Sequence, residues 1–244
     1  MKVKFKAVIL LCVSLGVSFL SAQTSSDTKA EAPHHSNFVD VSEIDIRQAI
    51  PLPPAPDSLA AAADLETLLR VQASRTADQV AYAKMVVNDS AYMYAPILGS
   101  WFTAQNLPLT SALIEQVEQD ANGLSGRLKV LYKRTRPFLL SADVKPCVIR
   151  PKTDSYPSGH TYRAYVRAAV LAELFPEKRA ALFDEAHKIA WARVVGGVHF
   201  PTDTAGGRIL AESFVKELLK NPKFIDQVNK ARAEAAPFLL KKAA

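Results

Sequence analysis

The fold is decided by residues 158–219, which read SGHTYRAYVRAAVLAELFPEKRAALFDEAHKIAWARVVGGVHFPTDTAGGRILAESFVKELL. Apolar side chains recur in this stretch every three or four residues, as they do on one face of a helix. They form three sets: Tyr162, Tyr165, Val166, Ala169 and Val170; Leu182, Phe183, Ala186, Ile189, Ala190 and Val194; and Ile209, Leu210, Phe214 and Leu218. Pro176 and the pair Gly196-Gly197 separate the sets, because proline and consecutive glycines interrupt helices. The stretch predicts three consecutive helices whose apolar faces share one core.

Helical spacing continues on both sides of this stretch. We expect further helices after Asp57, after Thr76, over residues 89–105 with a bend at Pro96, from Pro108 to Asn122, over residues 124–135, and after Pro222. Residues 137–157 contain four prolines and no helical period, and they predict a long loop. No alternating strand pattern of useful length and no internal repeat occurs. The predicted fold class is all-α, with a single compact helical-bundle domain over residues 51–244.

The first 22 residues have the pattern of a secretory signal peptide. Three lysines precede an apolar run over residues 7–20, and Ser21-Ala22 supplies the small residues of a cleavage site. The run is too short for a comfortable membrane span, and no later segment reaches the roughly 20 apolar residues that a spanning helix needs. We therefore expect a periplasmic or secreted protein without stable membrane insertion, whose mature N-terminus is flexible over residues 23–50.

The net charge gives no argument for a nucleic-acid or membrane partner, and the cysteine content excludes an internal disulfide. The formal net charge of +6 falls to +3 without the signal, because the signal carries three lysines and no acidic residue. This value is too small to argue for nucleic acid or a membrane as a partner. Cys147 is then the single cysteine of the mature chain, so an internal disulfide cannot form, and we interpret Cys147 as a small buried residue. His34 and His35 lie in the flexible segment and predict a solvated tail, not a metal site.

Three groups of residues could carry chemistry, and the first is a pair of cations. Lys129 and Arg136 are seven residues apart, which is two helical turns, so a continuous helix would place both on one face. Two cations on one face can hold an anion, and arginine binds phosphate through two parallel hydrogen bonds. Lys133 and Arg134 lie between them, so a solvated basic face is the ordinary interpretation of this group alone.

The second group is Ser158, Gly159 and His160, at the start of a predicted helix. Backbone N–H groups at a helix N-terminus are unpaired and attract anions. Gly159 would let the backbone come close to a ligand, Ser158 could cap the helix or donate to an oxyanion, and His160 could transfer a proton. A capped helix with an incidental histidine is the alternative.

The third group is Arg193, His199 and Asp203. A carboxylate beside a histidine can hold one ring nitrogen and leave the other free to attack. The Gly196-Gly197 pair would permit the turn that brings Arg193 back beside His199. A salt-bridged helix junction would use the same residues without any chemistry.

Taken in order, the three groups resemble the signature of the type 2 phosphatidic acid phosphatase superfamily. The matching segments are Lys129-x6-Arg136-Pro137, Pro157-Ser158-Gly159-His160 and Arg193-x5-His199-x3-Asp203. Residues 155–161 are in addition similar to a segment typical of bacterial class A non-specific acid phosphatases. The likeness runs from about Leu52 to the last helices. It implies a broad-range acid phosphatase that hydrolyses phosphate monoesters and needs no metal and no cofactor.

The resemblance also implies a role for each matching residue. His199 would attack phosphorus, Asp203 would orient His199, and His160 would protonate the leaving oxygen and later help to activate water. The phosphoryl oxygens would be bound by Lys129, Arg136, Ser158, Gly159 and Arg193. Two positions depart from the pattern, since Ala192 replaces the usual serine before the arginine and Asp154 stands where class A enzymes usually have glycine.

Several alternatives remain open. A lipid phosphate or diphosphate phosphatase of the same superfamily would usually carry several spanning helices, and a vanadium-dependent haloperoxidase would generally be much longer. A non-catalytic phosphate-binding module would keep the cations without needing both histidines and Asp203. The expected partners are small phosphorylated substrates, such as nucleotides and sugar or aryl phosphates. A homo-oligomer is a further possibility.

Overall fold

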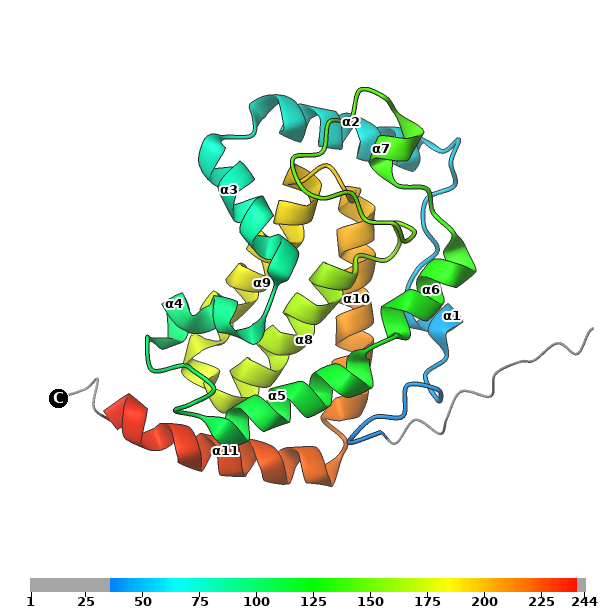
Figure 1. Cartoon of the computed structure of the whole chain (residues 1–244). Helices are drawn as coiled ribbons and strands as arrows, with labels where there is room; N and C mark the ends of the chain where they lie inside the picture. The colour runs from blue at the N-terminus through cyan, green and yellow to red at the C-terminus, as the bar shows by residue number, and fades with distance from the viewer. Residues whose placement is uncertain (1–35, 241–244) are drawn as a thin grey trace, which may run out of the picture. The chain divides into compact units, whose positions relative to one another are not determined.

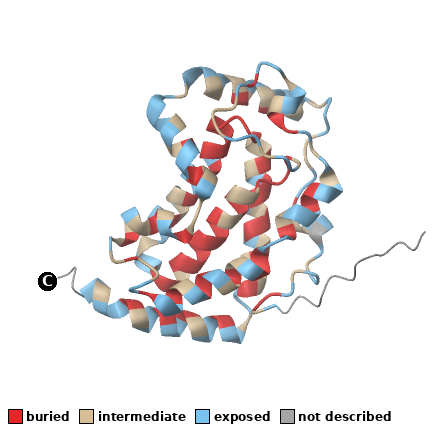
Figure 2. Ribbon diagram, viewed as in Figure 1, coloured by how far each residue is buried: buried red, intermediate tan, exposed pale blue. Residues whose placement is uncertain are grey.

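The computed structural model describes residues 36–240, and three long helices form their centre (Figure 1). These are α8 (Gly159–Leu174), α9 (Arg179–Val195) and α10 (Pro201–Leu218). The three predicted apolar sets fall on them in order, and α8 packs against both α9 and α10. Ala164, Ala168 and Leu171 of α8 are fully buried. Figure 2 accordingly shows α8 buried along most of its length, as expected of a helix that is apolar on nearly every side.

The remaining helices surround these three. The longer ones are α2 (Leu59–Ser74), α3 (Ala77–Met85), α5 (Pro108–Ala121), α6 (Leu124–Tyr132) and α11 (Pro222–Leu240). Short helical turns are α1 (Ile46–Ala49), η1 (Val86–Asn88), η2 (Ala91–Tyr94), α4 (Ala95–Leu98), α7 (Pro137–Leu140) and η3 (Pro176–Lys178). No strand occurs over residues 36–240, so the all-α prediction is confirmed. None of the helices in this part of the chain is long and apolar enough to cross a membrane.

The predicted helix over residues 89–105 is wrong. The chain there forms η2 and α4 and then a loop, because Ser90 is extended and Gly99 ends α4 at φ 128°. Pro96 stands in the first turn of α4, where its missing N–H costs nothing, so it begins a helix and does not bend one. A Cβ at Gly99 would lie 2.5 Å from the Trp101 ring, which explains the glycine at this turn.

The predicted helix over residues 124–135 ends early, at Tyr132. Lys133 adopts a left-handed conformation with φ 47°, and its N–H donates to the Lys129 carbonyl at 2.9 Å. Arg136 therefore lies beyond the helix, in extended backbone before α7. The argument that Lys129 and Arg136 share one helix face is thus wrong, although both side chains reach the same loop.

The segment expected to be flexible, residues 23–50, is described from residue 36, and there it is packed. Phe38 and Val39 are buried in the core. The Asp120 carboxylate of α5 accepts hydrogen bonds from the backbone N–H groups of Phe38 and Val39, at 2.6 and 3.0 Å. The predicted signal peptide and the His34-His35 pair lie outside the described residues. Cys147 is half-buried, with its Sγ 3.6 Å from the Val195 carbonyl, so its interpretation as a buried residue is also corrected.

Candidate active site

The N-termini of α8 and α10 meet, and this junction positions the candidate site. The Ser158 N–H, at the cap of α8, donates to the Asp203 carbonyl in the first turn of α10 at 2.9 Å. Glycines of α10 permit the approach, since a Cβ at Gly207 would lie 2.5 Å from the Ser158 carbonyl oxygen and one at Gly206 would lie 2.5 Å from the Tyr156 ring. The sequence thus places small residues where two helix ends must touch.

His199 and Asp203 form a buried pair at this junction. His199 Nδ1 lies 3.2 Å from Asp203 Oδ2, and Arg136 Nη1 lies 2.9 Å from His199 Nε2. A guanidinium can only donate, so Nε2 is the acceptor in that contact and Nδ1 carries the proton toward Asp203. Burial lowers the pKa of His199 well below its usual value, although the hydrogen bond to Asp203 raises it. The ring is therefore neutral, with its Nε2 lone pair facing a cation.

The Asp203 carboxylate is held by more partners than His199 alone. Oδ2 accepts hydrogen bonds from the Phe200 N–H at 2.9 Å and from Ser155 Oγ at 2.5 Å. Oδ1 forms an ion pair of 2.6 Å with Arg134 Nη1. Burial raises the pKa of Asp203, but the hydrogen bond and charge of His199, together with Arg134, lower it to about 2. Asp203 is therefore ionised under all ordinary conditions.

Two of the predicted cations lie over the loop that precedes α8. Lys129 Nζ donates to the carbonyls of Asp154 and Ser155, at 2.6 and 3.1 Å. Arg136 donates from Nε to the Thr153 carbonyl at 2.8 Å and from Nη1 to the Val198 carbonyl at 2.6 Å. Burial and the charge of Arg136 lower the pKa of Lys129 to about 7. Positive charge is thus crowded here, and an incoming anion would relieve it.

Arg193, at the end of α9, is the clearest sign of an anion site. It is 1% exposed, and its Nε and Nη1 have no hydrogen-bond partner among the described residues. Burial, followed by the charge of Arg136, lowers its pKa to about 10, so the group is still charged at neutral pH. A buried charged group without partners is costly, which makes an anion the natural partner for these two N–H donors.

His160 lies in the first turn of α8, and its side chain is 22% exposed. Its Nε2 lies 3.2 Å from the Val87 carbonyl oxygen and 3.6 Å from Asp89 Oδ1. Burial and the charge of Arg193 lower the pKa of His160 to about 4, although Asp89 raises it. In the ligand-free site this ring is therefore neutral above mildly acidic pH.

Ser158 and Gly159 form the start of α8. The Ser158 hydroxyl accepts from the Thr161 N–H at 3.4 Å and from Thr161 Oγ1 at 3.0 Å, so it acts as a helix cap. A Cβ at Gly159 would make only ordinary contacts, 3.4 Å from Ser125 Oγ and 3.6 Å from Arg163 Nη1. Crowding within the ligand-free protein therefore does not require this glycine, and any requirement would come from a ligand.

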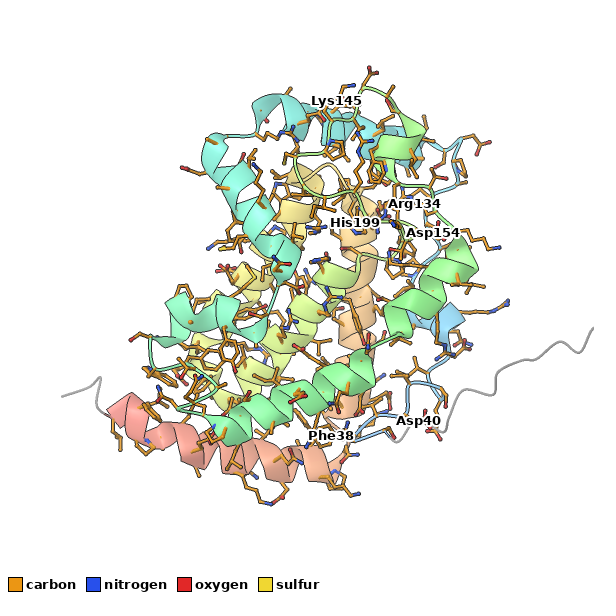
Figure 3. The ribbon with its side chains drawn as sticks, viewed as in Figure 1. Phe38, Asp40, Arg134, Lys145, Asp154 and His199 are labelled. Carbon is orange, nitrogen blue, oxygen red and sulfur yellow. The ribbon has the colours of Figure 1, made fainter. Side chains whose placement is uncertain are left out.

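Sequence reasoning missed two residues behind the Asp203 carboxylate. Arg134, interpreted above as part of a solvated basic face, is largely shielded from solvent, pairs with Asp203, and also pairs with Asp64 Oδ2 at 2.7 Å. Its guanidinium lies 4.3 Å from the centroid of the Phe200 ring. Asp64 also accepts from the Thr202 N–H at 3.1 Å and from the Thr202 hydroxyl. Figure 3 shows Arg134 and His199 close together near the start of α10, with Asp154 beside them.

A signal for Asp64 was present in the sequence. Asp64 and Leu68 are one helical turn apart, and both are buried on the same face of α2. An acidic residue on an apolar helix face requires a buried cation as partner.

Among residues 36–240 no group of three or more His, Cys, Asp or Glu side chains is placed to hold a metal ion. Whether the activity depends on a metal is therefore a question for experiment.

Comparison with known proteins finds a family model and several acid phosphatases that this chain resembles. A family model described as the PAP2 superfamily matches residues 110–223. The non-specific acid phosphatase of Providencia stuartii is 31% identical over 159 residues, 63% of this chain and 64% of that relative, just under two thirds of its length. The non-specific acid phosphatase of Salmonella typhimurium is 28% identical over 232 residues, 89% of this chain and 90% of that relative.

A solved structure shares the fold. A bacterial vanadium-dependent iodoperoxidase aligns with a TM-score of 0.55 at 18% identity, over 71% of this chain and 54% of that one. The region matched by the family model contains all three motif segments, from Lys129 to Asp203. Over these residues the chain is similar to the PAP2 superfamily.

Proposed function

We propose that this protein is an exported acid phosphatase that hydrolyses phosphate monoesters through a phosphohistidine on His199. The observation that carries the proposal is the orientation of His199. Its Nδ1–H is directed to the Asp203 carboxylate, and its Nε2 lone pair faces the Arg136 guanidinium. A neutral imidazole held in this tautomer is a nucleophile with a fixed direction of attack. The two acid phosphatase relatives support the reaction class.

The phosphoryl group would sit among the cations. Arg193 offers two unpartnered N–H donors, and Arg136 would turn its Nη1 from His199 Nε2 to a phosphoryl oxygen. Lys129 adds a third charge, and the backbone N–H groups at the start of α8 add the partial charge of a helix N-terminus. Phosphoryl transfer needs mainly positioning and charge stabilisation, which such a set supplies.

The reaction would take place in two steps. In the first, His199 Nε2 forms a bond to phosphorus while the bond from phosphorus to the leaving oxygen breaks, and that oxygen takes a proton from His160. In the second, water attacks phosphorus and gives a proton to His160, and the N–P bond breaks to release inorganic phosphate. The pKa of His160 is about 4 in the ligand-free site, so the negative charge of bound phosphate has to raise it for His160 to act as the acid. An acidic working range follows.

The alternatives differ in what they require. A non-catalytic phosphate-binding module would need the cations but not an oriented His199–Asp203 pair. A lipid phosphate phosphatase would use the same chemistry on another substrate, and a panel of nucleotides, sugar phosphates, aryl phosphates and phosphatidic acid would separate the two enzymes. Metal independence stays a prediction, because fixed cations could bind phosphate unaided. Activity should survive exhaustive EDTA treatment, and restoration of lost activity by a divalent ion would contradict the proposed mechanism.

The decisive experiment separates the two histidines. His199→Ala should trap no phosphate from any substrate, because the nucleophile is gone. His160→Ala should lose far more activity on an alkyl phosphate than on p-nitrophenyl phosphate, since only a strongly basic leaving oxygen needs the acid. Acid quench with labelled substrate, followed by mass spectrometry of the His199 peptide, measures the intermediate. Label on His160 instead would reverse the two roles.

A further inference from the structure

His160 is held through one of its two ring nitrogens, and this contact decides which nitrogen can exchange a proton with a substrate. Nε2 lies 3.2 Å from the Val87 carbonyl oxygen, which can only accept a hydrogen bond. Nε2 therefore carries a proton whether the ring is neutral or charged. Nδ1 makes no hydrogen bond to any of residues 36–240. It follows that Nδ1 is the nitrogen available to exchange a proton with a leaving oxygen or with water.

We propose that Asp89 is a positioning residue for His160, forming a second carboxylate–histidine pair beside that of Asp203 and His199. Asp89 Oδ1 lies 3.6 Å from His160 Nε2, the nitrogen that also contacts the Val87 carbonyl. The inference rests on the proposed role of His160 as the acid of the reaction. Asp89 lies outside the three motif segments and belongs to the region between η1 and η2, where the chain runs from α3 to α4 across α8 (Figure 1).

Two arginines of α8 fix the Asp89 carboxylate. Arg163 Nη2 lies 3.0 Å from Oδ1, and Arg167 Nη1 lies 2.5 Å from Oδ2. They follow His160 by three and seven residues, so all three side chains lie along one face of the helix. The Asp89 side chain is 5% exposed and so cannot rely on water for stabilisation. The carboxylate is thus held between the His160 ring and two guanidinium groups.

Asp89 keeps its negative charge at the pH where the acid must work. Burial raises the pKa of Asp89, but the charges of Arg163 and Arg167 lower it below its usual value. Burial, Arg193 and Arg163 oppose protonation of the His160 ring, whereas Asp89 and the hydrogen bond to the Val87 carbonyl favour it. A ring that must take up a second proton beside Arg193 and Arg163 is helped by such a carboxylate. Asp89 would supply the charge that lets Nδ1 hold a proton.

The chain provides a matched control. Arg167 also pairs with Glu118 of α5, its Nε lying 2.5 Å from Glu118 Oε1. Glu118→Gln therefore weakens the other ion pair of Arg167 and leaves the contacts of His160 unchanged. Asp89→Asn keeps the size of the side chain and removes the charge, and Asp89→Glu restores the charge with a longer arm. The four enzymes, including the wild type, should be compared on an alkyl phosphate and on p-nitrophenyl phosphate across the pH range.

Asp89→Asn should reduce kcat on the alkyl phosphate ~10- to 100-fold and on p-nitrophenyl phosphate by less than ~3-fold. Loss of the carboxylate lowers the pKa of His160, so the alkaline limb of the pH profile should move about one unit to lower pH. Asp89→Glu should recover part of both effects, and Glu118→Gln should show neither. Equal losses on both substrates, or the same behaviour in Glu118→Gln, would mean that Asp89 only holds the fold.

A double-mutant cycle separates failure of this inference from failure of the proposed function. In the His160→Ala background, Asp89→Asn should cost less than ~2-fold, because the residue it serves is absent. A full, additive loss would overturn the inference. If His160→Ala itself shows no leaving-group dependence, the role of His160 as the acid is what fails.

The wild-type protein offers a test that needs no variant to fold. Nitrogen-15 NMR of the histidine rings should find neutral His160 protonated at Nε2 and neutral His199 protonated at Nδ1. The two active-site histidines are thus expected in opposite tautomers. His160 protonated at Nδ1 would contradict the placement of its proton against Val87 and Asp89.

Discussion

Hydrogen bonds of the site converge on the Asp203 carboxylate. It accepts from the Phe200 N–H and Ser155 Oγ, faces His199 Nδ1, and forms an ion pair with Arg134. With so many donors fixed around it, the carboxylate cannot rotate. Its contact with Nδ1 therefore also fixes the orientation of the His199 ring. The site therefore depends on Asp203 for geometry and for the tautomer of His199.

Asp203→Asn should lower kcat ~10²- to 10⁴-fold, because an amide can present its NH₂ group to Nδ1 and favour the wrong tautomer. Circular dichroism should show the helices intact. Ser155→Ala is the matched control, since it removes one donor to the same oxygen and leaves the charge, and it should lose much less. A near-normal rate in Asp203→Asn would show that another group orients His199.

Asp203 should also make the free energy of unfolding depend on pH in the acidic range. Its pKa of about 2 lies below the ordinary value of ~3.9, so its contribution is fully present above about pH 4 and is lost as the pH falls through 2. The contribution is about 2 kcal/mol. Urea unfolding between pH 2 and pH 5 should give a free energy of unfolding that decreases as the pH is lowered in the wild type. The decrease should be smaller in Asp203→Asn. Parallel curves for the two proteins would contradict this assignment.

At the scale of helices, the close approach of α8 and α10 rests on Gly207. Gly207→Ala would press a methyl group against the Ser158 carbonyl and separate the two helix ends. We expect a loss of ~1–3 kcal/mol in unfolding free energy and up to ~10²-fold in kcat, since the start of α8 and Asp203 would move apart.

The control for this change is Gly126→Ala in α6. A Cβ there has nothing within 4 Å, so the change should stabilise the protein by ~0.5–1 kcal/mol and leave the rate unchanged. Chemical denaturation and steady-state kinetics on both variants measure the contrast. Equal effects at the two glycines would contradict the claim that the close approach of α8 and α10 depends on Gly207.

The same scale shows what the sequence could predict. The helices α8, α9 and α10 follow from apolar spacing because each buries a continuous face. The helix predicted over residues 89–105 is wrong because apolar side chains such as Ala91 and Leu98 can be buried from short turns as well as from a helix. Arg134 and Asp64 could not be paired in advance, because 70 residues separate them and only the fold brings them together. The motif segments contain the candidate site residues, but they do not specify Arg134, Asp64 or Asp89 as partners of those residues.

For the whole molecule, binding of an anion should raise stability. A phosphate or vanadate ion at 100 times its Kd would add about 2.7 kcal/mol if it binds only the folded state. Tm should therefore rise with either ion, and vanadate should inhibit competitively, because its trigonal-bipyramidal form resembles the transition state. Arg193→Gln should abolish most of this rise. Arg208→Gln, at an exposed ion pair with Glu212, should preserve it. An unchanged rise in Arg193→Gln would place the anion elsewhere.

The unpartnered guanidinium of Arg193 has a consequence for regulation by metabolite concentration. Its two free N–H donors are satisfied by any tetrahedral oxyanion, whether esterified or not. The released phosphate carries every oxygen that the cations bind, and it lacks only the ester group. If the proposed function holds, product inhibition follows from the site itself, and turnover should slow as inorganic phosphate accumulates. The enzyme would work fastest when its surroundings are starved of phosphate, so its rate would follow demand without any separate control site.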